Sequence, residues 1–94
     1  MVFVKKLVLD VLKPHVPSGL ELAKAIAEQG DDYHVTFVVQ EVDEKTETVA
    51  IVIEGKDLRF EDVESTIKSL GASLHSVDEI QVVNRPAPDS ASTD

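Results

Sequence analysis

Four stretches of the chain have the two-residue periodicity of β-strands, and two have the periodicity of amphipathic helices. The strand patterns cover residues 5–12, 33–43, 48–54 and 73–83, and the helical patterns cover residues 18–30 and 58–70. Their order along the chain is therefore β-α-β-β-α-β. With right-handed crossovers this order predicts an α+β fold, the ferredoxin-like split βαβ sandwich, in which two helices cover one face of a four-stranded antiparallel sheet.

Both expected helices carry recognisable end signals. Ser18 and Glu21 have the spacing of a capping box, in which the serine hydroxyl caps the helix start and the glutamate reaches back. Gly30 and Gly71 follow the two helical patterns, and glycine is a common helix terminator. These signals support the positions of the two helices.

Composition restricts the classes of function. The chain has 18 Asp and Glu against 9 Lys and Arg, so its net charge is -9. Because affinity for a phosphate backbone comes from Lys and Arg, we expect no nucleic-acid partner. The absence of cysteine excludes disulfides and thiolate chemistry. No apolar run approaches membrane-spanning length and nothing resembles a signal peptide, so we expect a cytoplasmic protein without a membrane partner.

The length of the chain suits one domain. We expect residues 1–85 to form a single ferredoxin-like domain and residues 86–94, with the sequence P-A-P-D-S-A-S-T-D, to form a disordered tail. A domain of this size buries only about 60–65% of the surface that its unfolded chain exposes. Association with another subunit would therefore add useful stability.

The face of the expected sheet that the helices leave open carries an apolar stripe. By strand alternation, this face should hold Val8, Leu12, Val38 and Val52. Scattered surface valines are common, but a contiguous apolar stripe is typical of a surface that another molecule covers. We expect these four residues to be the oligomer face of a homo-oligomer.

The last strand pattern contains an irregularity. Its expected buried residues are Leu74, Val77, Ile80 and Val82. The three-residue step from Val77 to Ile80 breaks the strand period, which predicts a β-bulge at Asp78-Glu79.

A small group of polar residues should gather near this bulge. Asp10 lies in the middle of the first strand, where a charge among apolar neighbours needs a partner or water. In the expected topology the first and last strands are neighbours, so Asp10 can approach part of the S-V-D-E stretch, Ser76 to Glu79. His15 follows the first strand and His75 begins the last one, and antiparallel pairing should make these two ends neighbours.

The other polar positions have simpler interpretations. The acids of the expected hairpin, Asp43, Glu44 and Glu47, are interpreted as a solvated tip, and His34 as a residue beside a turn.

Four interpretations of Asp78 and Glu79 remain open. They can be solvated charges that discourage aggregation at a strand edge. They can form salt bridges across a subunit contact, with candidate partners Lys5, Lys6, Lys13 and Arg85. Together with Asp10 they can bind a hard cation such as Ca²⁺ or Mg²⁺. In the fourth interpretation Asp10 or Glu79 performs acid–base catalysis with His15 or His75, although nothing indicates a nucleophile or a phosphate-binding loop.

Three motifs resemble an archaeal family. The stretches V-L-D-V-L-K-P-H from Val8, E-V-D-E-K-T-E from Glu41 and G-A-S-L-H-S-V-D-E-I from Gly71 are similar to patterns of the domain-of-unknown-function 211 family. The resemblance covers residues 5–85. The chain departs from the family pattern at V-Q-E-V-D, where an apolar pair more often precedes E-I-D, and in its P-A-P-D-S tail.

This resemblance implies a ferredoxin-like fold, closed homo-oligomeric rings and bound divalent cations, with no established catalytic role for any residue. It carries over a set of ligand or interface candidates, which are Asp10, Lys13, Pro14, His15, His75, Ser76, Asp78 and Glu79.

The sequence thus supports three hypotheses of function. The first is a non-enzymatic, ring-like homo-oligomer that binds a divalent cation or a small ligand at subunit junctions. The second is a regulatory module that senses a small molecule, which rests on analogy of fold. The third is a small acid–base enzyme that uses Asp10 with His15 or His75.

Overall fold

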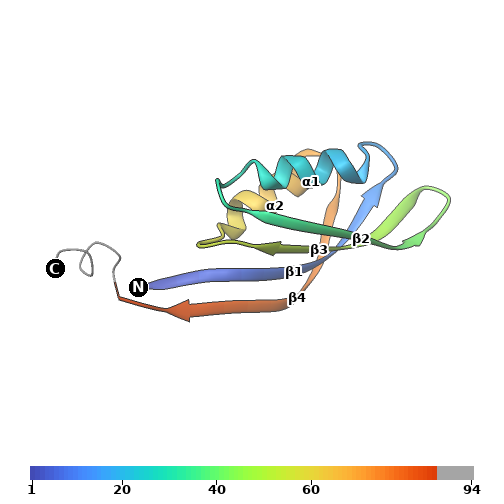
Figure 1. Ribbon diagram of the computed structural model, residues 1–94. Helices are drawn as coiled ribbons and strands as arrows, with labels where there is room; N and C mark the ends of the chain where they lie inside the picture. The colour runs from blue at the N-terminus through green and yellow to red at the C-terminus, as the bar shows by residue number, and fades with distance from the viewer. Residues whose placement is uncertain (87–94) are drawn as a thin grey trace.

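The computed structural model describes residues 1–86, and the part of the expected tail at residues 87–94 lies outside this range. The elements are β1 (Val2–Pro14), α1 (Gly19–Ala27), β2 (His34–Val42), β3 (Thr46–Glu54), α2 (Phe60–Ser69) and β4 (Ser73–Asn84). The strands form one antiparallel sheet in the order β2-β3-β1-β4, and both helices lie on the same face of it (Figure 1). The ferredoxin-like α+β prediction is confirmed.

Strand β1 is longer than its sequence pattern indicated. The pattern predicted residues 5–12, whereas the strand begins at Val2 and ends at Pro14. Its pairing with β3 starts only at Lys6, so residues 2–4 pair with β4 alone. The start of β1 and the end of β4 consequently extend as a two-stranded ribbon past the helices (Figure 1).

The predicted helix signals are present. The Ser18 hydroxyl accepts a hydrogen bond from the Glu21 backbone N–H at 3.2 Å, and the Glu21 carboxylate accepts one from the Ser18 N–H at 3.1 Å. Helix α1 ends at Ala27, before the predicted terminator Gly30. Gly71, after α2, has a φ of 84°, a left-handed conformation that favours glycine.

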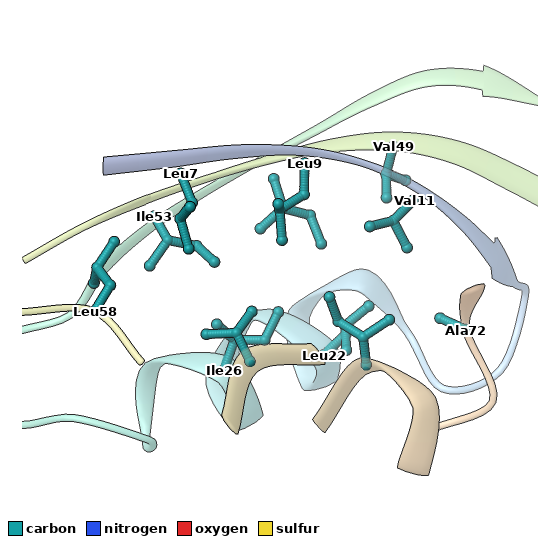
Figure 2. Packing of buried hydrophobic residues seen from close by; sticks show 12 residues of the cluster. Leu7, Leu9, Val11, Leu22, Ile26, Val49, Ile53, Leu58 and Ala72 are labelled. Carbon is teal, nitrogen blue, oxygen red and sulfur yellow. The ribbon is translucent and has the colours of Figure 1, made fainter. Parts of the chain in front are cut away.

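The hydrophobic core lies between the sheet and the helices. Leu9 of β1 and Ile51 of β3 have no exposed surface, and the same holds for Leu22 and Ile26 of α1. Figure 2 shows these helix residues pointing toward the inner face of β1 and β3. The remaining core residues are Leu7, Val11, Val49, Ile53, Leu58, Val63, Ile67 and Ala72.

Strand β4 is less buried than the sequence pattern predicted. Leu74 is partly buried, but Val77, Ile80 and Val82 expose 37%, 61% and 50% of their surfaces. The prediction of burial is therefore wrong for these three residues within one chain. The physical reason is that β4 is an edge strand without a neighbour on its outer side, and the buried core that the helices form lies over β1 and β3.

Neither helix within residues 1–86 combines the length and the apolar character needed to cross a membrane.

Candidate functional site

Strand β4 contains the predicted bulge. In its pairing with β1, Glu79 lies opposite Val8 and Val77 lies opposite Leu9, so Asp78 has no partner. The extra residue shifts the strand period, which places both Val77 and Ile80 on the side of the sheet that faces the helices. The bulge also lies directly beside the middle of β1, where Asp10 is found.

Asp10 and His75 are brought into contact, whereas the strand pairing suggested Ser76 to Glu79 as the neighbours of Asp10. Asp10 lies opposite Ser76 of β4, and a second register shift leaves His75 unpaired. The Nδ1 atom of His75 lies 3.1 Å from Oδ2 of Asp10. The second carboxylate oxygen, Oδ1, is buried and has no hydrogen-bond partner among the described residues.

This pair borders a shallow hollow. Its volume is about 330 Å³, and Val11, Leu12 and Thr48 line it together with Asp10 and His75. A carboxylate at Nδ1 orients an imidazole ring and leaves Nε2 free to exchange a proton or bind a metal. The imidazole of His75 is 76% exposed, so solvent reaches most of the ring.

The other acids of this region have partners of their own. The Ser76 hydroxyl donates to Oδ1 of Asp78 at 2.7 Å. Lys6 and Glu79 form a salt bridge of 3.2 Å, with the Glu79 side chain 52% exposed. The sequence suggested that Glu79 forms a salt bridge with a lysine or arginine of another subunit. In the structure its partner is Lys6 of the same chain.

The three acids proposed as cation ligands do not form a ready site. Asp10 binds His75, Asp78 binds Ser76 and Glu79 binds Lys6. Within residues 1–86, no group of three or more His, Asp or Glu side chains is arranged to hold a metal ion. Ca²⁺ in proteins is typically bound by about six to eight oxygen ligands. A cation here would therefore need further ligands from outside the described chain.

A second polar group lies at the other end of β1. Lys13 has no exposed surface, and its ammonium donates to the carbonyl oxygens of Pro14 at 2.7 Å and Pro17 at 2.8 Å. Its Nζ also lies 3.4 Å from Oε1 of Glu47 on β3. Nδ1 of His15 lies 3.0 Å from Oε2 of the same glutamate. One carboxylate therefore holds both basic groups.

His15 also connects the loop after β1 to the β2–β3 hairpin. Its Nε2 lies 3.1 Å from the carbonyl oxygen of Asp43 and 3.0 Å from that of Glu44. Because both ring nitrogens face acceptors, the doubly protonated, cationic ring fits these contacts best. The hydrogen bond to Glu47 is the main reason that the pKa of His15 is raised above 6.5. The same bond, followed by that from Lys13, lowers the pKa of Glu47 below 4.5.

The two histidines therefore take part in two separate polar groups, and the expectation that they are neighbours is wrong. His75 contacts Asp10 across the β1–β4 pair, whereas His15 contacts Glu47 of β3 and the β2–β3 hairpin at Asp43. The hypothesis of acid–base catalysis keeps only the Asp10–His75 pair, because no hydrogen bond among residues 1–86 joins Asp10 to His15.

The sequence interpretation missed the role of Glu47, which was assigned to a solvated hairpin tip. A signal for Lys13 was present, because it is in phase with the core residues Leu7, Leu9 and Val11 of the same strand. That phase predicts an inward side chain. Glu47 carried the same signal, because it is in phase with the buried residues Val49, Ile51 and Ile53 of its own strand. Only its pairing with Lys13 depends on the register of β1 with β3.

The four residues of the expected oligomer face lie together on the open face. Val8 lies opposite Val52 in the β1–β3 pair, and Val38 lies opposite Ala50 in the β2–β3 pair. Leu12 and Val38 expose 42% and 48% of their surfaces, while Val8 and Val52 are partly buried by their neighbours. The stripe thus crosses β2, β3 and β1 on the side away from the helices.

Comparison with known proteins agrees with the motif resemblance. The model of the DUF211 family, described as "Uncharacterized ArCR", matches residues 5–86. "Uncharacterized protein MJ0319" of Methanocaldococcus jannaschii is 38% identical over 77 residues, which cover 82% of this chain and 79% of that protein. The family match includes the β1 and β4 motifs that carry the polar groups described above. The chain belongs to the archaeal DUF211 family.

Proposed function

We propose that this protein acts as a non-enzymatic homo-oligomer in which the open sheet face of one subunit is covered by another. The observation that supports this proposal is the apolar stripe of Val8, Leu12, Val38 and Val52, which the helices of the chain leave uncovered. Complete burial of a large aliphatic side chain contributes about 1.5–3 kcal/mol. Because Leu12 and Val38 retain nearly half of their exposure, they have the most to gain from a covering subunit.

A ring is the proposed form of the assembly. Rings arise when two different surfaces of a subunit meet and the rotation between copies closes. The sheet offers such surfaces at its two edges, since β2 and β4 each have one unpaired side. Both carry exposed apolar residues, namely Val39 and Val42 on β2 and Ile80 and Val82 on β4. Edges of this kind invite pairing with another chain.

The test compares two leucine substitutions by native mass spectrometry and light scattering at micromolar subunit concentration. Leu12→Glu places a charge in the stripe, whereas Leu20→Glu makes the same change on α1, where the side chain is 66% exposed. We expect the parent protein and Leu20→Glu to form one defined oligomer and Leu12→Glu to dissociate. A second stripe variant, Val38→Glu, should behave like Leu12→Glu.

A strictly monomeric parent protein would refute self-association. An oligomer that survives both stripe substitutions would show that this face is not the contact. A continuous series of oligomer masses, in place of one defined mass, would refute the ring, because a contact that does not close gives open assemblies.

A further inference from the structure

We propose that a pocket beside the start of β1 binds a small organic anion that carries phosphate groups and a flat apolar part, such as a nucleoside phosphate. The pocket has a volume of about 310 Å³ and is lined by Phe3, Lys5, Lys56, Arg85 and Pro86. Small-molecule sites usually start at about 300 Å³. Its lining includes the start of β1, which leads from the N-terminus marked in Figure 1, and contains none of the four residues of the proposed oligomer face.

Backbone contacts place two of the cations side by side. The loop between β3 and α2 binds β1 twice, with the Gly55 N–H donating to the Lys5 carbonyl at 3.1 Å and the Leu58 N–H donating to Val4 at 2.8 Å. Lys56 lies between these anchors. Its own N–H donates to the Asp32 carboxylate at 2.7 Å, which fixes the loop further. The pairing of β1 with β4 skips Lys5, and such a bulge re-aims a side chain.

The third cation comes from the end of β4. The Arg85 N–H donates to the Met1 carbonyl at 2.8 Å, which holds Arg85 against the start of β1. Phe3 lies opposite Val83 in the same pair of strands. Three segments that are distant in sequence thus contribute the cationic and apolar parts of one pocket.

The charges of this pocket lack partners within the described chain. Lys6, Lys13 and Lys68 form salt bridges, whereas no salt bridge joins Lys5, Lys56 or Arg85 to any residue of 1–86. Among residues 1–86, no Asp or Glu lines this pocket. Three like charges around one cavity repel one another, and an anion between them removes that repulsion. In a chain of net charge -9, such a cationic pocket runs against the overall composition.

The lining also indicates the class of anion. The guanidinium of Arg85 can bind phosphate oxygens with two parallel hydrogen bonds, and the two lysines supply point charges. The ring of Phe3 and the ring of Pro86 offer apolar surface for a flat group, as aromatic side chains do for nucleobases. A phosphate-bearing molecule with a planar ring uses both features.

Isothermal titration calorimetry of the full-length protein at low salt, with EDTA present, tests this proposal. The probes are ADP, adenosine, pyrophosphate and citrate. We expect saturable binding of ADP, weaker binding of pyrophosphate, and no binding of adenosine. Citrate separates phosphate from carboxylate recognition and should bind more weakly than ADP.

Matched variants locate the site. The double variant Lys56→Gln with Arg85→Gln should weaken ADP binding by at least about 10-fold, because it removes two charge-assisted contacts. The control, Lys24→Gln with Lys45→Gln, changes the net charge equally but alters residues outside the lining. Phe3→Leu should weaken ADP and leave pyrophosphate unchanged. Circular dichroism verifies that each variant is folded.

Absence of saturable binding by both ADP and pyrophosphate would overturn the proposal. An equal loss in the control double variant would do the same, because the binding would then reflect net charge alone. Citrate binding as tight as that of ADP would refute phosphate recognition. Displacement of ADP by a lower concentration of oligo-dT would identify a nucleic-acid surface in place of a small-molecule site.

Discussion

Replacement of Lys13 by methionine tests whether the contacts of a buried ammonium stabilise this fold. Lys13 has no exposed surface, and its Nζ contacts the Pro14 and Pro17 carbonyls at 2.7 and 2.8 Å and Glu47 at 3.4 Å. Methionine fills a similar volume with an apolar chain but donates no hydrogen bond. The substitution therefore removes the polar contacts and keeps most of the packing.

Two opposing effects set the magnitude. Hydrogen bonds to charged groups contribute about 1.5–3 kcal/mol each, so the two to carbonyl oxygens amount to about 3–6 kcal/mol. Removal of a buried ammonium also relieves its desolvation, which costs several kcal/mol. We expect Lys13→Met to lower the free energy of unfolding by about 1–3 kcal/mol, or about 5–20 °C in Tm for a domain of this size. Lys13→Ala also loses side-chain methylenes and should lower it by about 2 kcal/mol more.

Urea and thermal unfolding followed by circular dichroism measures these differences. All samples need the same subunit concentration, because association would shift the apparent stability. Lys24→Met is the control, since this side chain is exposed on α1 and should change stability by less than about 0.5 kcal/mol. A Lys13→Met protein as stable as the parent would show that the contacts only balance the desolvation, which would refute the reasoning. Equal stabilities of Lys13→Met and Lys13→Ala would refute the contribution of packing.

Three further substitutions or conditions test other parts of the structure. The raised pKa of His15 gives stability that is complete below pH 6.5 and is lost as pH rises through the folded-state pKa. The lowered pKa of Glu47 gives stability that is present above pH 4.5 and is lost as pH falls through its folded-state pKa. The stability difference between the parent and His15→Gln should therefore be larger at pH 5.5 than at pH 8.5 in urea titrations, and an equal difference at both would contradict these contacts. Ser18→Ala removes the cap of α1 and should cost about 1 kcal/mol in thermal unfolding, with Ser18→Thr nearly unchanged. Gly71→Ala forces an alanine to a φ of 84° and should cost about 1–2 kcal/mol by the same measurement, whereas no loss would show that the turn relaxes.

Part of the candidate site could be predicted from local pattern. The three-residue step from Val77 to Ile80 predicted the bulge, because side chains alternate strictly along a regular strand. The β-α-β-β-α-β order predicted that β1 and β4 are neighbours, and this placed Asp10 beside the S-V-D-E stretch, where Ser76 is its partner across the strands. The separation of His15 from His75 was not predictable in the same way. It depends on how far β1 runs past β4 and on where the β2–β3 hairpin folds.

The order of strands and helices, the capping box at Ser18 and the face of its strand on which each stripe residue lies were determined by the sequence itself, because each follows from periodicity or from spacing within one segment. The tertiary structure alone decided which charged side chains distant in sequence become partners. Glu47 meets Lys13 through the β1–β3 register, and Lys56 joins Lys5 because a loop binds β1. It also decided that Ile80 remains exposed, since β4 is an edge strand outside the buried core. Such contacts join residues distant in sequence, and their geometry exists only once the sheet is paired and the helices are packed on it.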